Sequence, residues 1–178
     1  RYYQLRNSML NIGKINKLNV VKKQGADVYL DNGTSGKVLL ADKKMSATCQ
    51  VGDTLEVFVY VDSEGHLAAT TKIPFAQVDD IAWLKVVSLN YVGAFLDWGL
   101  PKDLLVPFSE QHHEMEVGRS YLVKVFLDDK NRIAATTKID RFINDESVDF
   151  EVGQKVSLII AEKTELGFKA IVNNTHWG

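Results

Sequence analysis

Apolar and polar residues alternate in several short stretches of the chain. The clearest stretch is Thr54–Val61 (TLEVFVYV), in which valine recurs at every second position. A period of two indicates a β-strand with one buried and one exposed face. The same reasoning predicts five strands in the first part of the chain, at Gly13–Val21, Asp27–Leu30, Lys37–Leu40, Thr54–Val61 and His66–Lys72.

This pattern occurs twice, at a constant offset of 66 residues. Residues 67–73 read LAATTKI and residues 133–139 read IAATTKI. Without any gap, residues 18–73 and 84–139 are identical at 18 of 56 positions. Identity at a fixed offset over such a length indicates an internal duplication. We therefore expect one domain at residues 10–73 and a second at residues 79–139.

Each repeat is predicted to be a small all-β barrel. Ala41–Gln50 and Pro107–Glu116 lack strand character, separate the third and fourth strands, and have room for a short helix. Five strands with this interruption are typical of an OB-fold barrel. The turn clusters 62–65 (DSEG) and 128–131 (DDKN) are predicted to close the last hairpin of each barrel.

A third, incomplete barrel is predicted at residues 150–178. Val156–Ile160 and Gly167–Val172 resemble the first two strands of another repeat, and Asn173–Gly178 is expected to form its first turn. Two strands cannot close a barrel, so the chain is expected to be a fragment. At the other end, Met9 is a plausible natural start, with residues 1–8 as an extension.

Composition and charge exclude several classes of protein. Hydrophobic residues make up 46% of the chain and charged residues 25%, as in an ordinary globular protein. A net charge of −2 gives no global field that would attract nucleic acid or anionic lipid, so any such binding must be local. The single Cys49 fits a reducing cytoplasm, and no apolar run is long enough for a membrane span. We expect a cytoplasmic protein.

No arrangement of residues predicts catalysis, a metal or a cofactor. Adjacent His112 and His113 in the segment 110–114 (EQHHE) do not share a helix face, so a metal site is not expected there. Asn32–Lys37 (NGTSGK) has two residues between its glycines, whereas a phosphate loop needs four. This segment is predicted to be a turn between strands.

The second repeat resembles an S1 RNA-binding domain, a branch of the OB fold. The resemblance depends on Val92–Leu96 (VGAFL), Leu105–Glu110 (LVPFSE), Val117-Gly118 with the strand that follows, and Arg132–Lys138 (RIAATTK). From residue 10 to residue 178, the tandem arrangement resembles the conserved virulence factor B family. That resemblance implies successive S1-like barrels followed by a winged-helix domain, absent from this chain, and a role as an RNA-binding regulator.

The resemblance implies four contact positions in each barrel: two aromatics in the second strand, a histidine in the third and a basic residue in the last. One of the four is retained in each repeat. The second repeat has Phe95 as the second aromatic, and the first repeat has Tyr29 there. The other three positions are occupied by Val92, Pro107 and Ala134 in the second repeat and by Ala26, Ala41 and Ala68 in the first.

The candidate RNA-binding residues lie on and beside these strands. Alternation places Tyr29 and Phe95 on the outer face, where a ring can stack on a base or pack under a loop. Trp98 either extends this platform or covers an end of the core. The basic residues beside the strands either meet phosphates or only solvate the surface; they are Lys37, Lys72, Lys102, Arg132 and Lys138.

The sequence therefore predicts a non-catalytic protein that binds single-stranded RNA across strands two and three. Stacking does not depend on the 2′-hydroxyl, so single-stranded DNA remains an alternative ligand. A second hypothesis is that the barrels are a spacer or protein-interaction module. Residues 10–73 hold eight basic and seven acidic residues, and residues 79–139 hold seven and nine, which favours that alternative.

Overall fold

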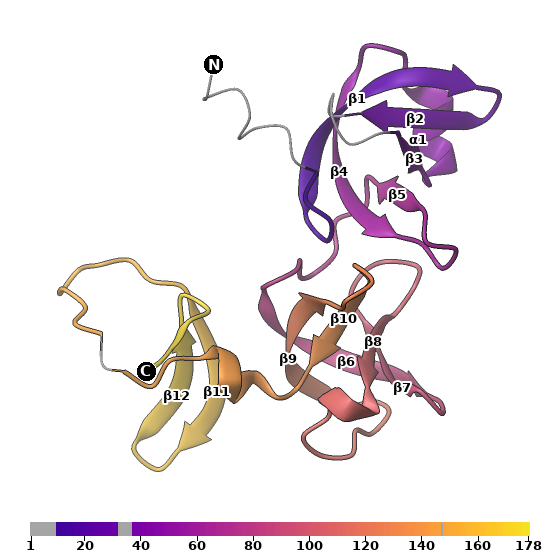
Figure 1. Cartoon of the computed structure of the whole chain (residues 1–178). Helices are drawn as coiled ribbons and strands as arrows, with labels where there is room; N and C mark the ends of the chain where they lie inside the picture. The colour runs from indigo at the N-terminus through magenta and orange to yellow at the C-terminus, as the bar shows by residue number, and fades with distance from the viewer. Residues whose placement is uncertain (1–9, 32–36, 147) are drawn as a thin grey trace. The chain divides into compact units, whose positions relative to one another are not determined.

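The computed structural model describes residues 10–31, 37–146 and 148–178 (Figure 1). The chain folds as two compact units, the first centred on the first barrel and the second on the second barrel and a third sheet. The possible start at Met9 and most of the glycine-rich segment Asn32–Lys37 lie outside the described residues.

The first repeat is a closed five-stranded barrel. Its strands are β1 (Ile15–Gln24), β2 (Asp27–Asp31), β3 (Val38–Leu40), β4 (Thr54–Val61) and β5 (Leu67–Thr70). They follow one another in the order β1-β2-β3-β5-β4. The pair β3–β5 is parallel and the other pairs are antiparallel. This confirms the predicted OB-type barrel.

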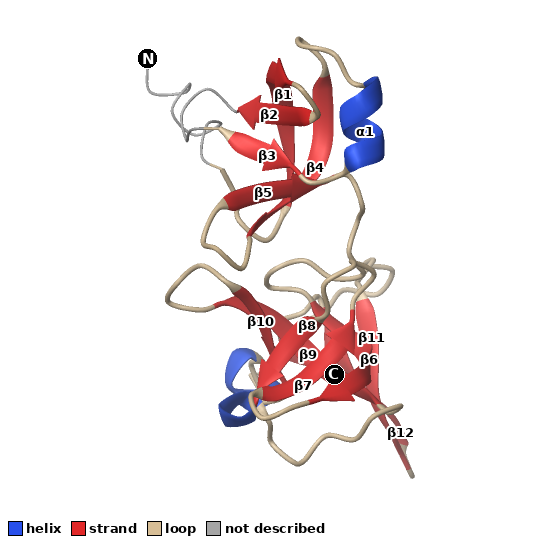
Figure 2. Cartoon of the chain, turned by 90° about the vertical axis from the view of Figure 1, so that its right-hand side faces the viewer, coloured by secondary structure: helices blue, strands red, loops and turns tan. Residues whose placement is uncertain are grey.

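The period-two pattern accounts for the barrel core. Alternate residues of each strand face inward and are almost completely buried, including Leu18, Val20, Val28, Leu30, Val57 and Val59. The interruption between β3 and β4 contains a short helix, α1 (Lys43–Thr48), as predicted. Asp42 caps this helix, because its carboxylate accepts the N–H groups of Lys44 and Met45. Figure 2 shows α1 beside the strands of this barrel.

The second repeat has the same strands in the same succession. They are β6 (Ile81–Leu89), β7 (Gly93–Asp97), β8 (Leu104–Pro107), β9 (Ser120–Leu127) and β10 (Ile133–Thr136). The 3-10 helix η1 (Phe108–Glu110) occupies the place of α1. The register of β1 on β2 shifts between Val20 and Lys22, and the register of β6 on β7 shifts between Val86 and Ser88. Thus the offset of 66 residues extends to the position of a β-bulge.

The second barrel, unlike the first, is not closed by a complete ladder. Its sheet has the order β10-β9-β6-β7-β8, so β8 and β10 are its two edges. In the first barrel, the Ala41 N–H donates to the Ala69 carbonyl at 2.8 Å and extends the β3–β5 pairing. The residue equivalent to Ala41 is Pro107, which has no N–H to donate. Proline thus removes one of the hydrogen bonds that close this fold.

The third sheet contains three strands in the order β11-β12-β13. They are β11 (Leu158–Thr164), β12 (Gly167–Val172) and β13 (His176–Trp177), and the 3-10 helix η2 (Ile139–Phe142) precedes them. The turn predicted at Asn173–Gly178 covers only residues 173–175, because His176 and Trp177 form β13, which pairs with β12. The register of β11 on β12 shifts between Ile160 and Glu162, as in the two barrels. This sheet has the opening hairpin of a third repeat.

Candidate nucleic-acid interface

The outer face of the first barrel has a row of apolar and aromatic residues across four strands. Tyr29 pairs with Leu39, Leu39 with Ala68, and Ala68 with Tyr60. Directly paired residues project from the same face of a sheet, so these four side chains lie on the same side, where Tyr29, Leu39 and Tyr60 reach the surface and Ala68 is buried. Val28 and Leu30, on either side of Tyr29, have no exposed surface. The prediction that Tyr29 faces outward from this strand is therefore confirmed.

An open pocket of about 570 Å³ lies beside Tyr29. Tyr29, Leu39 and Leu67 form its apolar part. Lys37, His66 and Glu64 form its polar part, together with Asp62 and Gly65. Two residues that the sequence suggested separately, Tyr29 and Lys37, thus line one concave site. An aromatic ring beside a cation is the combination that holds a base and its phosphate.

The β4–β5 hairpin presents His66 and Glu64 to this pocket from a fixed turn. The Asp62 carboxylate accepts the N–H groups of Glu64 and His66, each at 2.9 Å. These bonds, that of His66 foremost, lower the pKa of Asp62. Gly65 has a φ of 85°, a left-handed conformation that glycine adopts without strain. The His66 Nδ1 lies 3.5 Å from a Glu64 carboxylate oxygen.

The second barrel places Phe95 as the first barrel places Tyr29. Phe95 pairs with Leu105 and is half-buried, whereas its neighbours Ala94 and Leu96 are fully buried. This confirms the outward direction that alternation predicted. Whether either ring stacks on a base stays a prediction.

The hairpin after β9 repeats the turn of the first barrel with different charges. Asp128 accepts the N–H groups of Lys130 and Arg132 at 2.8 and 2.9 Å, as Asp62 does in the first barrel. Lys130 stands where the first repeat has Glu64, and Arg132 stands where it has His66. Arg132 Nε also lies 3.1 Å from the Asp128 carboxylate, so this predicted phosphate contact is already part of an ion pair.

Trp98 has only 6% of its surface exposed. A ring buried to this extent has no free face for a base, so the expectation that Trp98 extends the stacking platform is not supported by its position. The alternative, that Trp98 covers an end of the core, agrees with its burial.

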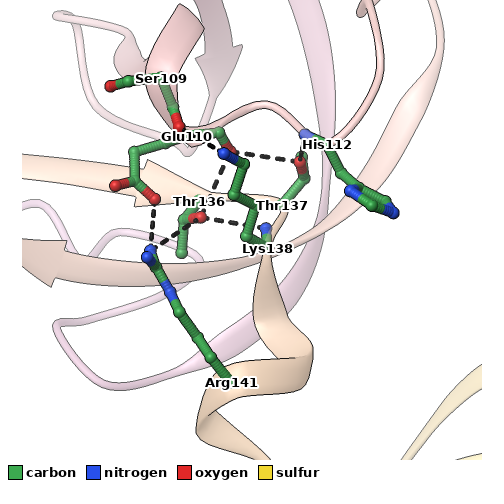
Figure 3. Close-up of polar contacts among 7 residues, drawn as sticks. All are labelled: Ser109, Glu110, His112, Thr136, Thr137, Lys138 and Arg141. Carbon is green, nitrogen blue, oxygen red and sulfur yellow. Dashed lines mark hydrogen bonds and ion pairs between the residues drawn. The ribbon is translucent and has the colours of Figure 1, made fainter.

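The identical segment AATTK near the end of each repeat joins strands within each barrel. In the second barrel, Lys138 Nζ donates to the Ser109 carbonyl at 2.7 Å, and the Thr137 N–H donates to the Glu110 carbonyl at 3.0 Å (Figure 3). The Arg141 guanidinium pairs with the Glu110 carboxylate. Lys138, predicted to contact phosphate, is thus engaged in holding η1 against the end of β10.

The first barrel has a corresponding contact that uses another acceptor. Thr71 Oγ1 donates to the Asp42 carboxylate at 2.8 Å, which lowers the pKa of Asp42. The Lys72 N–H donates to Thr70 Oγ1, as the Lys138 N–H does to Thr136 Oγ1. The Lys72 and Lys102 side chains are exposed. The most similar segment of the two repeats therefore has a structural role.

Four residues of this face and pocket were not predicted from the sequence: Leu39, Tyr60, Glu64 and His66. The outward position of Leu39 and Tyr60 could have been found from the repeat. The residues 66 positions later, Leu105 and Phe126, are also apolar and also alternate with buried residues. Glu64 and His66 gave no signal, because a turn segment is polar whether or not it binds a ligand.

No metal or membrane-spanning element is found in the described part of the chain. Among the described residues, no group of three or more His, Cys, Asp or Glu side chains is placed to hold a metal ion. The segment Glu110–Glu114 instead contributes Glu110 to the network around Arg141. No helix among those residues is long and apolar enough to cross a membrane.

The S1 domain family matches residues 12–72 and 80–138, which are the two barrels. The chain belongs to the S1 domain family. Its relatives include conserved virulence factor B of Staphylococcus epidermidis, 30% identical over 149 residues, and the uncharacterized protein YitL of Bacillus subtilis, 43% identical over 70 residues. The first match covers 76% of this chain and 50% of the relative, and the second covers 39% and 24%. The resemblance to conserved virulence factor B is confirmed.

A solved structure supports the architecture of this S1 protein. A multidomain protein with nucleic acid binding domains from Streptococcus pneumoniae superposes with a TM-score of 0.58 over 92% of this chain and 60% of that chain. The sequence identity is 18%, so this likeness concerns the fold. The chain spans about half the length of the conserved virulence factor B relatives.

Proposed function

We propose that this chain binds single-stranded RNA, without catalysing a reaction, across the outer faces of its two S1 barrels. The observation that carries this proposal is the pocket of the first barrel, where Tyr29 and Lys37 line one concave surface. A ring with a free face stabilises a stacked base by about 1–3 kcal/mol. Lys37 supplies a positive charge and hydrogen-bond donors for the stacked nucleotide.

The second barrel contributes a weaker, separate contact through Phe95. Its residues 79–139 carry two more acidic than basic residues, so electrostatic attraction adds little. Two weak sites on one chain still give useful affinity, because binding at the first raises the effective RNA concentration at the second. The protein as a whole would act as an RNA-binding regulator.

The proposal is supported by the family and by the described nucleic acid binding domains of the Streptococcus protein. Single-stranded RNA is preferred over duplex, because unstacked bases can reach an aromatic ring. The two barrels have near-neutral charge, which would also suit a spacer. The experiment must therefore distinguish a chain that binds RNA from a spacer that does not.

The test is a fluorescence anisotropy titration of this chain with a labelled single-stranded RNA and its DNA equivalent. We expect Tyr29→Ala with Phe95→Ala to weaken RNA binding at least about 10-fold, from two lost stacking contacts. Tyr91→Ala is the matched control, since this residue is 90% exposed and lies between β6 and β7, outside both strands. Equal affinity of wild type and double variant would contradict the proposed face. Equal binding of DNA would extend the ligand class.

A further inference from the structure

Two charged residues line the pocket beside Tyr29, and the second barrel has residues of opposite charge at the equivalent positions. Lys37 and Glu64 line the pocket of the first barrel. The residues 66 positions later are Asp103 and Lys130, so each charge is reversed. The two β-hairpins have the same hydrogen-bonded turn, in which Asp62 or Asp128 accepts two backbone N–H groups. The fold therefore does not require either charge.

The first barrel consequently has a carboxylate at the place where a phosphate-binding surface would have a cation. The Glu64 side chain is 78% exposed and lines the pocket with the cationic Lys37. A carboxylate repels phosphate but accepts hydrogen bonds from the N–H groups of a base edge. A lysine donates to base acceptors as well as to phosphate. The pair suits recognition of a base that has both donors and acceptors.

We propose that this pocket selects guanine, an inference that rests on the proposed RNA-binding function. Guanine has two adjacent donors, N1–H and the N2 amino group, which a carboxylate accepts together. It also has two acceptors, O6 and N7, which match a lysine. Adenine and cytosine offer only an amino group, and uracil places carbonyl oxygens on both sides of its N–H. Guanine stacked on Tyr29 therefore satisfies both Glu64 and Lys37.

The second barrel lacks this selectivity. Its hairpin has Lys130 and Arg132 in place of Glu64 and His66. Cations at this position attract phosphate or base acceptors, but they cannot accept the N1–H and N2 amino donors of guanine. The preference for guanine that depends on a carboxylate thus belongs to the first barrel.

The experiment measures the binding of this chain to four heptamers, UUUXUUU with X as G, A, C or U. Wild type should bind the guanine heptamer about 10-fold more tightly than the adenine heptamer, the range expected for one bidentate base contact. Glu64→Lys, which copies the second barrel, should reduce this ratio to about 1. Glu56→Lys makes the same charge change at an exposed glutamate outside the pocket, in β4, and should retain the ratio.

The outcomes separate this inference from the proposed function. Binding of all heptamers with equal affinity, or an unchanged ratio in Glu64→Lys, overturns the guanine proposal and leaves RNA binding in place. Binding of none of the heptamers overturns both. Loss of the preference for the guanine heptamer in both Glu64→Lys and Glu56→Lys also contradicts the guanine proposal, because the change in net charge alone would then account for the effect. Circular dichroism confirms that each variant is folded.

Discussion

The two barrels differ in how they close, although they share 18 of 56 aligned residues. In the first, β3 and β5 pair in parallel and the Ala41 N–H extends the ladder. In the second, Pro107 has no N–H, β8 and β10 are edges, and Thr137 with Arg141 joins this region through Glu110. One fold is thus completed by strand pairing in one repeat and by a backbone hydrogen bond with side-chain contacts at Glu110 in the other.

The residues that are identical in the two barrels are not the ones expected to bind a ligand. The most similar segment, AATTK, has structural roles in both barrels. The positions that differ, Lys37 with Glu64 against Asp103 with Lys130, lie at equivalent places on a shared framework. Divergence on an unchanged scaffold is where a change in ligand preference is expected.

The largest expected difference between the barrels is the loss of stability when alanine replaces Gly93 or its equivalent in the first barrel. Gly93 has a φ of 156°, and a Cβ atom there would lie 2.2 Å from the Val106 carbonyl oxygen. Gly93→Ala should therefore lower the free energy of unfolding by about 2 kcal/mol or more, from strain and backbone displacement. The equivalent residue of the first barrel is Asp27, which already has a Cβ, and Asp27→Ala should cost no more than about 0.5 kcal/mol.

Urea denaturation can follow this difference, because tryptophan fluorescence reports the second unit. All three tryptophans, Trp83, Trp98 and Trp177, lie in that unit. A denaturation midpoint unchanged by Gly93→Ala would show that β7 and β8 are further apart than described.

Exchanging the equivalent residues Ala41 and Pro107 tests whether the barrels close differently, and we expect an intermediate effect on stability. Ala41→Pro removes the N–H that bonds to Ala69 and leaves a buried carbonyl with fewer partners, so it should destabilise the first barrel by about 1–2 kcal/mol. Pro107→Ala should change the stability of the second barrel by less than about 1 kcal/mol, because the Glu110 contacts already hold that region. Amide hydrogen exchange of β3, β5, β8 and β10 measures both. Equal destabilisation by the two variants would contradict a different mode of closure.

Acid should destabilise the first barrel through a group that the second lacks. The Thr71 hydroxyl and the Met45 N–H lower the pKa of Asp42 below its ordinary 3.8, and the second repeat has Phe108 at this position. A lowered pKa in the folded state contributes stability above the unfolded pKa, which is lost as the pH falls through the folded pKa. Stability should therefore decline below about pH 4, and Asp42→Asn should reduce this decline.

Thr71→Val provides the complementary variant for this acid effect. It removes the main donor to Asp42 and so brings the folded-state pKa of Asp42 closer to its ordinary value. The acid loss of stability should therefore be smaller than that of wild type and complete at a higher pH. Hydrogen exchange of the first barrel between pH 5 and 2 measures both variants, with the intrinsic exchange rates corrected for pH. An acid limb identical in all three proteins would contradict the assigned role of Asp42.

Much of this fold could be predicted from periodicity. The bounds of β4 and β12 agree with the predicted Thr54–Val61 and Gly167–Val172, and the outward direction of Tyr29 and Phe95 follows from alternation. These features depend on local pattern, which the sequence contains directly. The two-residue strand β13 could not be predicted, because so short a segment has no period.

The candidate site was less accessible from sequence because it depends on distant neighbours. In the sequence, nothing distinguishes Lys138 from the other basic residues, because its contact with Ser109 is formed only in the fold. The burial of Trp98 likewise depends on residues remote in the chain. That Lys37 and Glu64 line one pocket can be seen only when the positions of β2, β3 and the β4–β5 hairpin are known together.

The central claim is that RNA binds the outer face of the first barrel around Tyr29. The most direct test is an NMR titration of the ¹⁵N-labelled chain with single-stranded RNA that maps amide shifts onto the structure. The largest shifts are expected at Tyr29, Lys37, Leu39 and the hairpin 62–67, with smaller shifts around Phe95. Shifts confined to β11–β13, or none in either barrel, would contradict this account and favour a spacer role for the two barrels.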